Sequence, residues 1–161
     1  MKLRNKTTRN LRWCCYIALA LCVLWIVLFS VNIFRSLFGF DEWPLHCINW
    51  SENGSFKIGV FVVYTLSVVM MVAFCVKMVI NMLKGLRENL AFPKTNIKLL
   101  FWFVLVDFVY HLSYSNLRVL WDNHAVFRLN YENFLIPFFL LFFAFMFKIA
   151  AEAVEENNLT V

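Results

Sequence analysis

The sequence has few of the residues that make a protein soluble or flexible. Only 16% of its 161 residues are charged, and it holds 4 Gly and 3 Pro. A soluble domain has about 25% charged residues, and disordered chains are rich in Pro, Gly and charge. A soluble domain of this length has no interior large enough for the 62% of residues that are hydrophobic. The solvent that fits such a chain is the lipid bilayer.

The cysteines and histidines lack the spacing of a redox or metal centre. The 5 Cys include no C-x-x-C pair, and four of them lie within apolar runs. Motifs for phosphate binding, serine hydrolysis and zinc peptidase activity are also missing. One histidine, His111, lies in an apolar run, whereas a haem held between helices needs paired imidazoles. We therefore expect no enzyme activity, no metal and no cofactor.

Four apolar runs predict four transmembrane helices, at approximately residues 13–34, 57–78, 97–114 and 134–152. The first contains Trp13–Val31, which as a helix spans about 28 Å, close to the hydrocarbon thickness of a bilayer. A basic segment precedes it, but the run is too long for a signal peptide. The expected fold class is an all-α integral membrane protein, a four-transmembrane-helix bundle in a single membrane domain over residues 1–161.

Lysine and arginine gather on one side of this topology. Such residues favour the cytoplasm, so we expect both termini and the loop 79–96 to be cytoplasmic and residues 35–56 and 115–133 to be external. The count is eleven on the cytoplasmic side against four, which are Arg35, Lys57, Arg118 and Arg128.

The external segments carry strand signals. Asn53-Gly54 lies between two short mixed runs, which is typical of a hairpin turn. Phe127, Leu129 and Tyr131 alternate with polar residues, as in a half-buried strand. These patterns suggest a small β-structured outer cap, with irregular interfacial loops as the alternative.

An ionisable pair lies inside the third run. Asp107 and His111 are four residues apart, so they share one helix face at about 6 Å along the axis. An unpaired carboxylate deep in the bilayer costs about 3 kcal/mol, so we expect Asp107 to face the bundle and to be paired or protonated. Lys148, Thr65 and Ser67 are accessory candidates. Two interpretations stay open: a proton- or ligand-responsive pair, and a polar clasp that fixes helix register.

The cytoplasmic loop and the C-terminal segment contain candidate interaction residues. Phe92 and Asn96 lead into the third run, where Thr95 or Asn96 is expected to cap the helix. Glu155 and Glu156 belong to an acidic face near the C-terminus. We expect these segments to offer a surface to a cytoplasmic partner.

On these residues the chain resembles the small bacterial membrane protein family catalogued as domain of unknown function 2975. Phe92 and Asn96 match the Phe-x-x-x-Asn step of that family, and Glu155, Glu156 and the final Leu-Thr-Val match its C-terminal pattern. The Gly often found before the acidic stretch is missing here. The resemblance implies a bacterial inner-membrane protein, and a cytoplasmic helix-turn-helix DNA-binding regulator as its partner. It implies no known activity.

The expected function is that of a sensor or regulatory partner of a cytoplasmic factor such as that regulator. The alternative is a small transporter or ion-coupled permease that uses Asp107 and His111. Transporters commonly show inverted repeats and broken helices, which this sequence does not. Direct nucleic-acid binding is not expected, because the basic residues flank the apolar runs. The lipid bilayer is the expected surrounding, and no oligomeric state is predicted.

Overall fold

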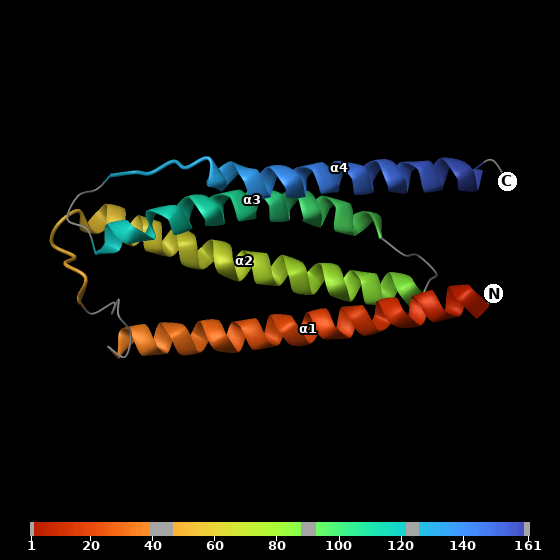
Figure 1. The fold of residues 1–161 in the computed structure, drawn as a ribbon, viewed down its shortest axis with the longest axis horizontal. Helices are drawn as coiled ribbons and strands as arrows, with labels where there is room; N and C mark the ends of the chain where they lie inside the picture. Colours follow the sequence, from red (N-terminus) through yellow and green to blue (C-terminus); the bar gives the residue numbers. More distant parts are fainter. Residues whose placement is uncertain (1, 39–46, 88–92, 122–125, 160–161) are drawn as a thin grey trace.

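Four long helices run side by side along the molecule (Figure 1). The computed structural model describes residues 2–38, 47–87, 93–121 and 126–159. The elements are α1 (Lys2–Leu37), α2 (Gly54–Arg87), α3 (Lys94–Asn116), the 3-10 helix η2 (Leu117–Leu120) and α4 (Glu132–Leu159).

The direction of the chain reverses at each connection between the four helices. As a result α1 begins and α4 ends at the same end of the molecule, where α2 also passes to α3 (Figure 1). We call this the terminal end. The opposite end, which carries residues 47–53, 117–121 and 126–131, is called the loop end.

All four helices are long and apolar enough to cross a membrane, over Thr7–Leu37, Gly54–Leu86, Lys94–Leu120 and Glu132–Ala153. The described residues form no strand, so the all-α, four-helix prediction is confirmed. Each helix is longer than its apolar run, because helical hydrogen bonds continue into the polar flanks, where the headgroup region tolerates them.

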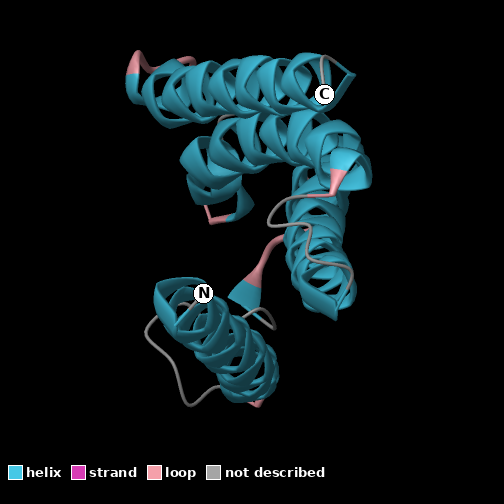
Figure 2. Cartoon of the chain, turned by 90° about the vertical axis from the view of Figure 1, so that its right-hand side faces the viewer, coloured by secondary structure: helices cyan, strands magenta, loops and turns pink. Residues whose placement is uncertain are grey.

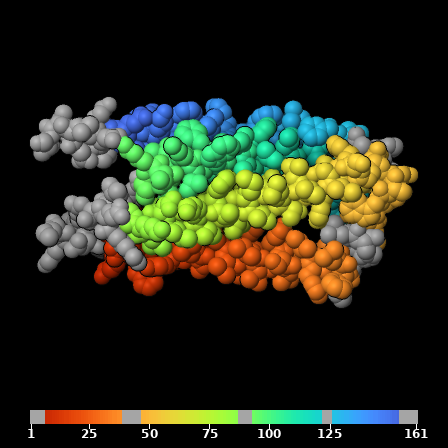
Figure 3. All heavy atoms as spheres, turned by 180° about the vertical axis from the view of Figure 1, so that it is seen from behind, coloured from red at the N-terminus to blue at the C-terminus, as the bar shows by residue number. Residues whose placement is uncertain are grey.

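The helices form an open row. Within the described residues, α2 packs against α1 and α3, and α3 packs against α4, whereas α1 approaches neither α3 nor α4. Seen end-on, α1 lies apart from the α3–α4 pair (Figure 2), and the space-filling view shows α2 between them (Figure 3). Polar residues that tie helices together are therefore expected along α2 and α3, each of which packs against two other long helices.

The outer surface of the row is apolar. Phe138 is 68% exposed, and most of the phenylalanines of α4 resemble it. Acyl chains are as apolar as these side chains, so burial inside the protein gains little in a membrane. Close approach between helices depends instead on small residues, such as Ala144 of α4, which is fully buried.

Asn53 and Gly54 start a helix, so the hairpin prediction is wrong. Asn53 has φ 54°, a left-handed conformation that asparagine tolerates, and α2 begins at the next residue. The backbone N–H groups of Phe56 and Lys57 donate to the Asn53 carbonyl. The positive φ therefore turns the loop into the first turn of α2, which is the other common use of this conformation beside a tight hairpin.

The half-buried strand is also wrong. Residues 126–130 carry no regular secondary structure, and Phe127, Leu129 and Tyr131 are 55%, 59% and 78% exposed. Alternation of apolar and polar residues predicts a strand only when a neighbouring strand or core covers the apolar face. No second strand is present among the described residues, and the β-structured cap has no support.

The start of α3 differs from the capping prediction. The residue before the first helical turn is Pro93, with φ −65° and ψ 138°, and no side chain caps the helix. Thr95 and Asn96 both lie inside the first turn, so neither is the N-cap. Proline suits this position because its fixed φ is compatible with a helix start and it has no N–H to satisfy.

Candidate functional site

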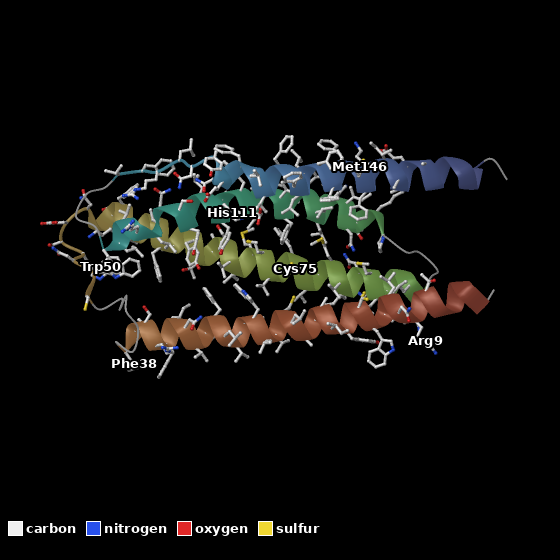
Figure 4. All side chains as sticks on the ribbon, in the orientation of Figure 1. Arg9, Phe38, Trp50, Cys75, His111 and Met146 are labelled. Atoms are coloured by element: carbon white, nitrogen blue, oxygen red, sulfur yellow. The ribbon has the colours of Figure 1, made fainter. Side chains whose placement is uncertain are left out.

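Asp107 lies midway along the candidate membrane span Lys94–Leu120, which comprises α3 and η2. It is equally distant in sequence from Lys94 and Leu120, at about 20 Å along the axis from each. The residue is buried, with 4% of its surface exposed. Figure 4 shows the neighbouring His111 on the same helix, between Trp50 at the loop end and Arg9 at the terminal end.

The two side chains are close but not hydrogen-bonded. His111 Nε2 lies 3.8 Å from Asp107 Oδ1, whereas a hydrogen bond of this type needs about 2.7–3.2 Å. The second carboxyl oxygen, Oδ2, is buried and has no hydrogen-bond partner among the described residues. An unsatisfied buried acceptor typically costs about 1–3 kcal/mol, and a buried charge costs more, so a proton on this carboxyl group would remove the larger of the two penalties.

Three tyrosine rings form a cluster next to the Asp107–His111 pair. The ring of Tyr64 on α2 stacks on that of Tyr110, with centroids 5.7 Å apart, and lies 6.4 Å from that of Tyr114. The rings of Tyr110 and His111 are 5.3 Å apart. This cluster belongs to the α2–α3 interface and lies next to His111.

Fixed charge is scarce around Asp107. Between Lys57 and Lys77, α2 carries Tyr64 and Cys75 as its ionisable side chains, and α4 has none between Glu132 and Lys148. The basic residue of η2, Arg118, is exposed. His111 is therefore the nearest described group able to balance a charge on Asp107.

The accessory candidates make other contacts. Thr65 donates to the Phe61 carbonyl at 2.9 Å and Ser67 to the Val63 carbonyl at 2.7 Å, so both hydroxyls bond within α2, as is usual for Ser and Thr in helices. Neither hydroxyl bonds to Asp107, so the structure does not join these two accessory candidates to the pair.

Lys148 likewise turns away from Asp107. Its Nζ lies 3.9 Å from Oε1 of Glu152, and both side chains are at least half exposed. A long lysine stem allows the charge to reach the headgroup region, which explains why this residue stays near the terminal end.

Asn96 is an internal clasp and not an interaction surface. It is 0% exposed. Its Oδ1 accepts a hydrogen bond from Asn81 Nδ2 at 2.9 Å, and its Nδ2 donates to the Met78 carbonyl at 2.9 Å. The prediction of a cytoplasmic contact is therefore wrong, because the side chain is used to join α2 to α3.

The other predicted interaction residues are not placed in detail. Phe92 lies outside the described residues. Glu155 and Glu156 lie on the last turns of α4, and their side chains lie outside the described part.

A second clasp lies at the loop end, and sequence reasoning missed it. Asn116 is 1% exposed. Its Nδ2 donates to the Arg128 carbonyl at 2.9 Å, and its Oδ1 accepts from the Arg128 N–H at 2.7 Å. The amide thus imitates a neighbouring strand and holds residues 126–130 in place. The polar cluster at the end of the third apolar run could have indicated this contact. Such clusters also mark the end of a membrane span, so the pattern did not distinguish the two.

Two further buried polar contacts belong to this end. Ser115 Oγ is within hydrogen-bond distance of Asn133 Oδ1, which joins α3 to the first turn of α4. Lys57, which is 1% exposed, donates to the Asn49 carbonyl at 3.0 Å. The first contact joins two helices and the second fastens the segment around Asn49 to the start of α2, so both shape the loop end.

Metal ligands do not gather anywhere in the described residues, which contain no group of three His, Cys, Asp or Glu able to hold an ion. The five cysteines are free thiols. The chemistry that remains is that of the Asp107–His111 pair.

No protein-family model, curated protein or solved structure matches the chain. The resemblance to the domain of unknown function 2975 therefore has no support from these comparisons, and any function has to be argued from the site.

Proposed function

We propose that the protein is a non-enzymatic, four-span regulatory membrane protein in which the Asp107–His111 pair responds to protons. The observation that carries this proposal is the buried, unpartnered Oδ2 of Asp107 in the middle of a membrane helix. Ionisable residues at this depth are costly and are commonly functional. Adding a proton to the carboxyl group removes its charge and supplies a hydrogen-bond donor.

The alternative role of the pair, a structural clasp, is weakened because other residues perform it. Asn96 joins α2 to α3, and Ser115 joins α3 to Asn133 of α4. The Oδ2 of Asp107 has no hydrogen-bond partner within the described residues. A residue that has an unbonded carboxyl oxygen and carries a desolvation cost is better explained by a change of state than by register.

The regulatory role rests on the two ends of the molecule. The terminal end carries exposed basic side chains, among them Arg9, Lys84 and Lys94, and the acidic last turns of α4. By the distribution of Lys and Arg we place this end in the cytoplasm of a bacterial cell, with the protein in the inner membrane. A cytoplasmic factor, such as a helix-turn-helix regulator, is the partner we propose there.

The test is an infrared pH titration of the purified protein in nanodiscs. A protonated buried carboxyl group gives a C=O stretching band apart from that of exposed carboxyls. We expect a band that grows as the pH falls, that is lost in Asp107→Asn and that is kept in Glu152→Gln, a matched change at an exposed carboxylate. Partner capture from mild detergent should depend on pH in the wild-type protein and lose this dependence in Asp107→Asn.

Two outcomes contradict the proposal. In one, Asp107→Asn retains the titrating band; in the other, it retains pH-dependent partner capture. The second candidate, an ion-coupled permease, is favoured by the same intramembrane pair and predicts proton-coupled flux in proteoliposomes. Flux that disappears in Asp107→Asn would replace the regulatory proposal with this one.

A further inference from the structure

Polar side chains continue from Asp107 toward one end of α3 only. Asp107, His111 and Ser115 follow one another at intervals of four residues and so form a stripe along one helix face. In the other direction the ten residues Ile97–Val106 are apolar apart from Lys98, which is exposed. The next buried polar group on that side is Asn96, about 16 Å away along the axis.

A contact between Ser115 and Asn133 of α4 connects this stripe to the loop end. Ser115 Oγ is 2.9 Å from the His111 carbonyl oxygen and also within hydrogen-bond distance of Asn133 Oδ1. A hydroxyl group has one proton and can rotate between two acceptors. Asn133 is 2% exposed, and its Nδ2 is a buried donor with no partner among the described residues.

The facing helix shows the same asymmetry. On α2, Tyr64 stacks on Tyr110 of α3, and the polar residues Thr65 and Ser67 follow it along α2. Farther toward the terminal end, residues 68–74 of α2 are all apolar. Polar groups therefore lie along the loop-end half of the α2–α3 contact, whereas residues 97–106 of α3, apart from the exposed Lys98, and residues 68–74 of α2 form an apolar stretch between Asp107 and the Asn81–Asn96 clasp.

We infer that protons reach Asp107 from the loop end, along His111, Ser115 and Asn133, and not from the terminal end. Rotating hydroxyl groups and single bridging water molecules carry protons between polar groups that lie on successive helix turns. The apolar segment Ile97–Val106 acts as the barrier on the opposite side. This inference rests on the proposed function, because it needs Asp107 to take up a proton, and it adds the side from which the proton comes.

The test is the rate of hydrogen–deuterium exchange of the Asp107 carboxyl group, followed by its infrared band in nanodiscs at a pH where the band is present. Ser115→Ala removes one hydrogen-bonding group from the route, so we expect exchange about fivefold slower, equivalent to about 1 kcal/mol. The matched control is Ser113→Ala. Ser113 bonds to the Val109 carbonyl of its own helix and lies on another face, so its removal should leave the rate unchanged.

A second pair of variants tests the same route in case Ser115→Ala does not fold. Asn133→Leu closes the loop-end entrance, and Asn81→Leu removes a polar group from the terminal end. Exchange should be slowed in Asn133→Leu and unchanged in Asn81→Leu, with the pH midpoint of the band unchanged in both.

The inference is overturned if Ser115→Ala and Asn133→Leu exchange at the wild-type rate, or if the variant of either control residue slows exchange equally. Those outcomes leave the proposed function standing, provided the band is lost in Asp107→Asn. If Asp107→Asn keeps the band, the proposed function and this inference both fall.

Discussion

The Asn96 clasp gives the most direct test of how α2 and α3 are held together. Its side chain is fully buried and takes part in two interhelical hydrogen bonds, with Asn81 and with the Met78 carbonyl. Asn96→Ala removes both bonds, leaves the Asn81 amide without its acceptor and opens a small cavity. Interhelical hydrogen bonds in membrane proteins contribute about 0.6 kcal/mol on average and at most about 1.7 kcal/mol.

Two such bonds and the stranded amide give an expected loss of about 1–3 kcal/mol in the free energy of unfolding. The assay is reversible unfolding in mixed micelles of a mild detergent and dodecyl sulfate. Thr95→Ala, which changes the adjacent exposed residue, is the control and should lie within about 0.5 kcal/mol of wild type.

The double change separates a clasp from a simple packing defect. When both partners of a buried pair become apolar, no polar group is left unsatisfied, and much of the loss is recovered. Asn81→Leu combined with Asn96→Leu should therefore be more stable than Asn96→Leu alone. A loss below about 0.5 kcal/mol for Asn96→Ala would refute the assignment of Asn96 as a clasp, and so would full additivity of the two leucine changes.

Three further predictions address the rest of the fold. Ala144→Leu should overpack the α3–α4 contact and lower the free energy of unfolding by about 1–3 kcal/mol in the same micelle assay, whereas a neutral result would mean that α4 does not approach α3 through this fully buried residue. Asn53→Val should be less stable than Asn53→Gly by about 1–2 kcal/mol, because φ at this position is 54°; equal unfolding midpoints would argue against the left-handed turn. Reporter fusions after Leu90 and at the C-terminus should read cytoplasmic and a fusion after Glu52 external, and the opposite reading at Leu90 would reject the proposed orientation.

The sequence predicts the four helices well because a membrane span is a local property. An uninterrupted run such as Trp13–Val31 has few alternatives once charge and proline are missing from its interior. The burial of Asp107 agrees in the same way with the cost of exposing a carboxylate to lipid.

The contacts between helices were much harder to predict. Asn96 fits a cap and an internal clasp equally well by sequence, and the choice depends on Asn81, fifteen residues earlier on another helix. Asn53 illustrates the same limit, since a residue with positive φ starts a helix or a hairpin according to the tertiary contacts of the next segment. Asn116 and Arg128 pair across a connection that periodicity does not describe.

The open row of helices has a consequence for how the protein is made. Within the described residues the four long helices pack on one another only as neighbours in the chain, α2 on α1, α3 on α2 and α4 on α3, and the short η2 packs on α2 and α3. No helix has to wait for a segment synthesised much later before it finds a partner. Contacts of this local kind form quickly and suit synthesis from the N-terminus. Each new helix can therefore dock on the one that left the ribosome just before it.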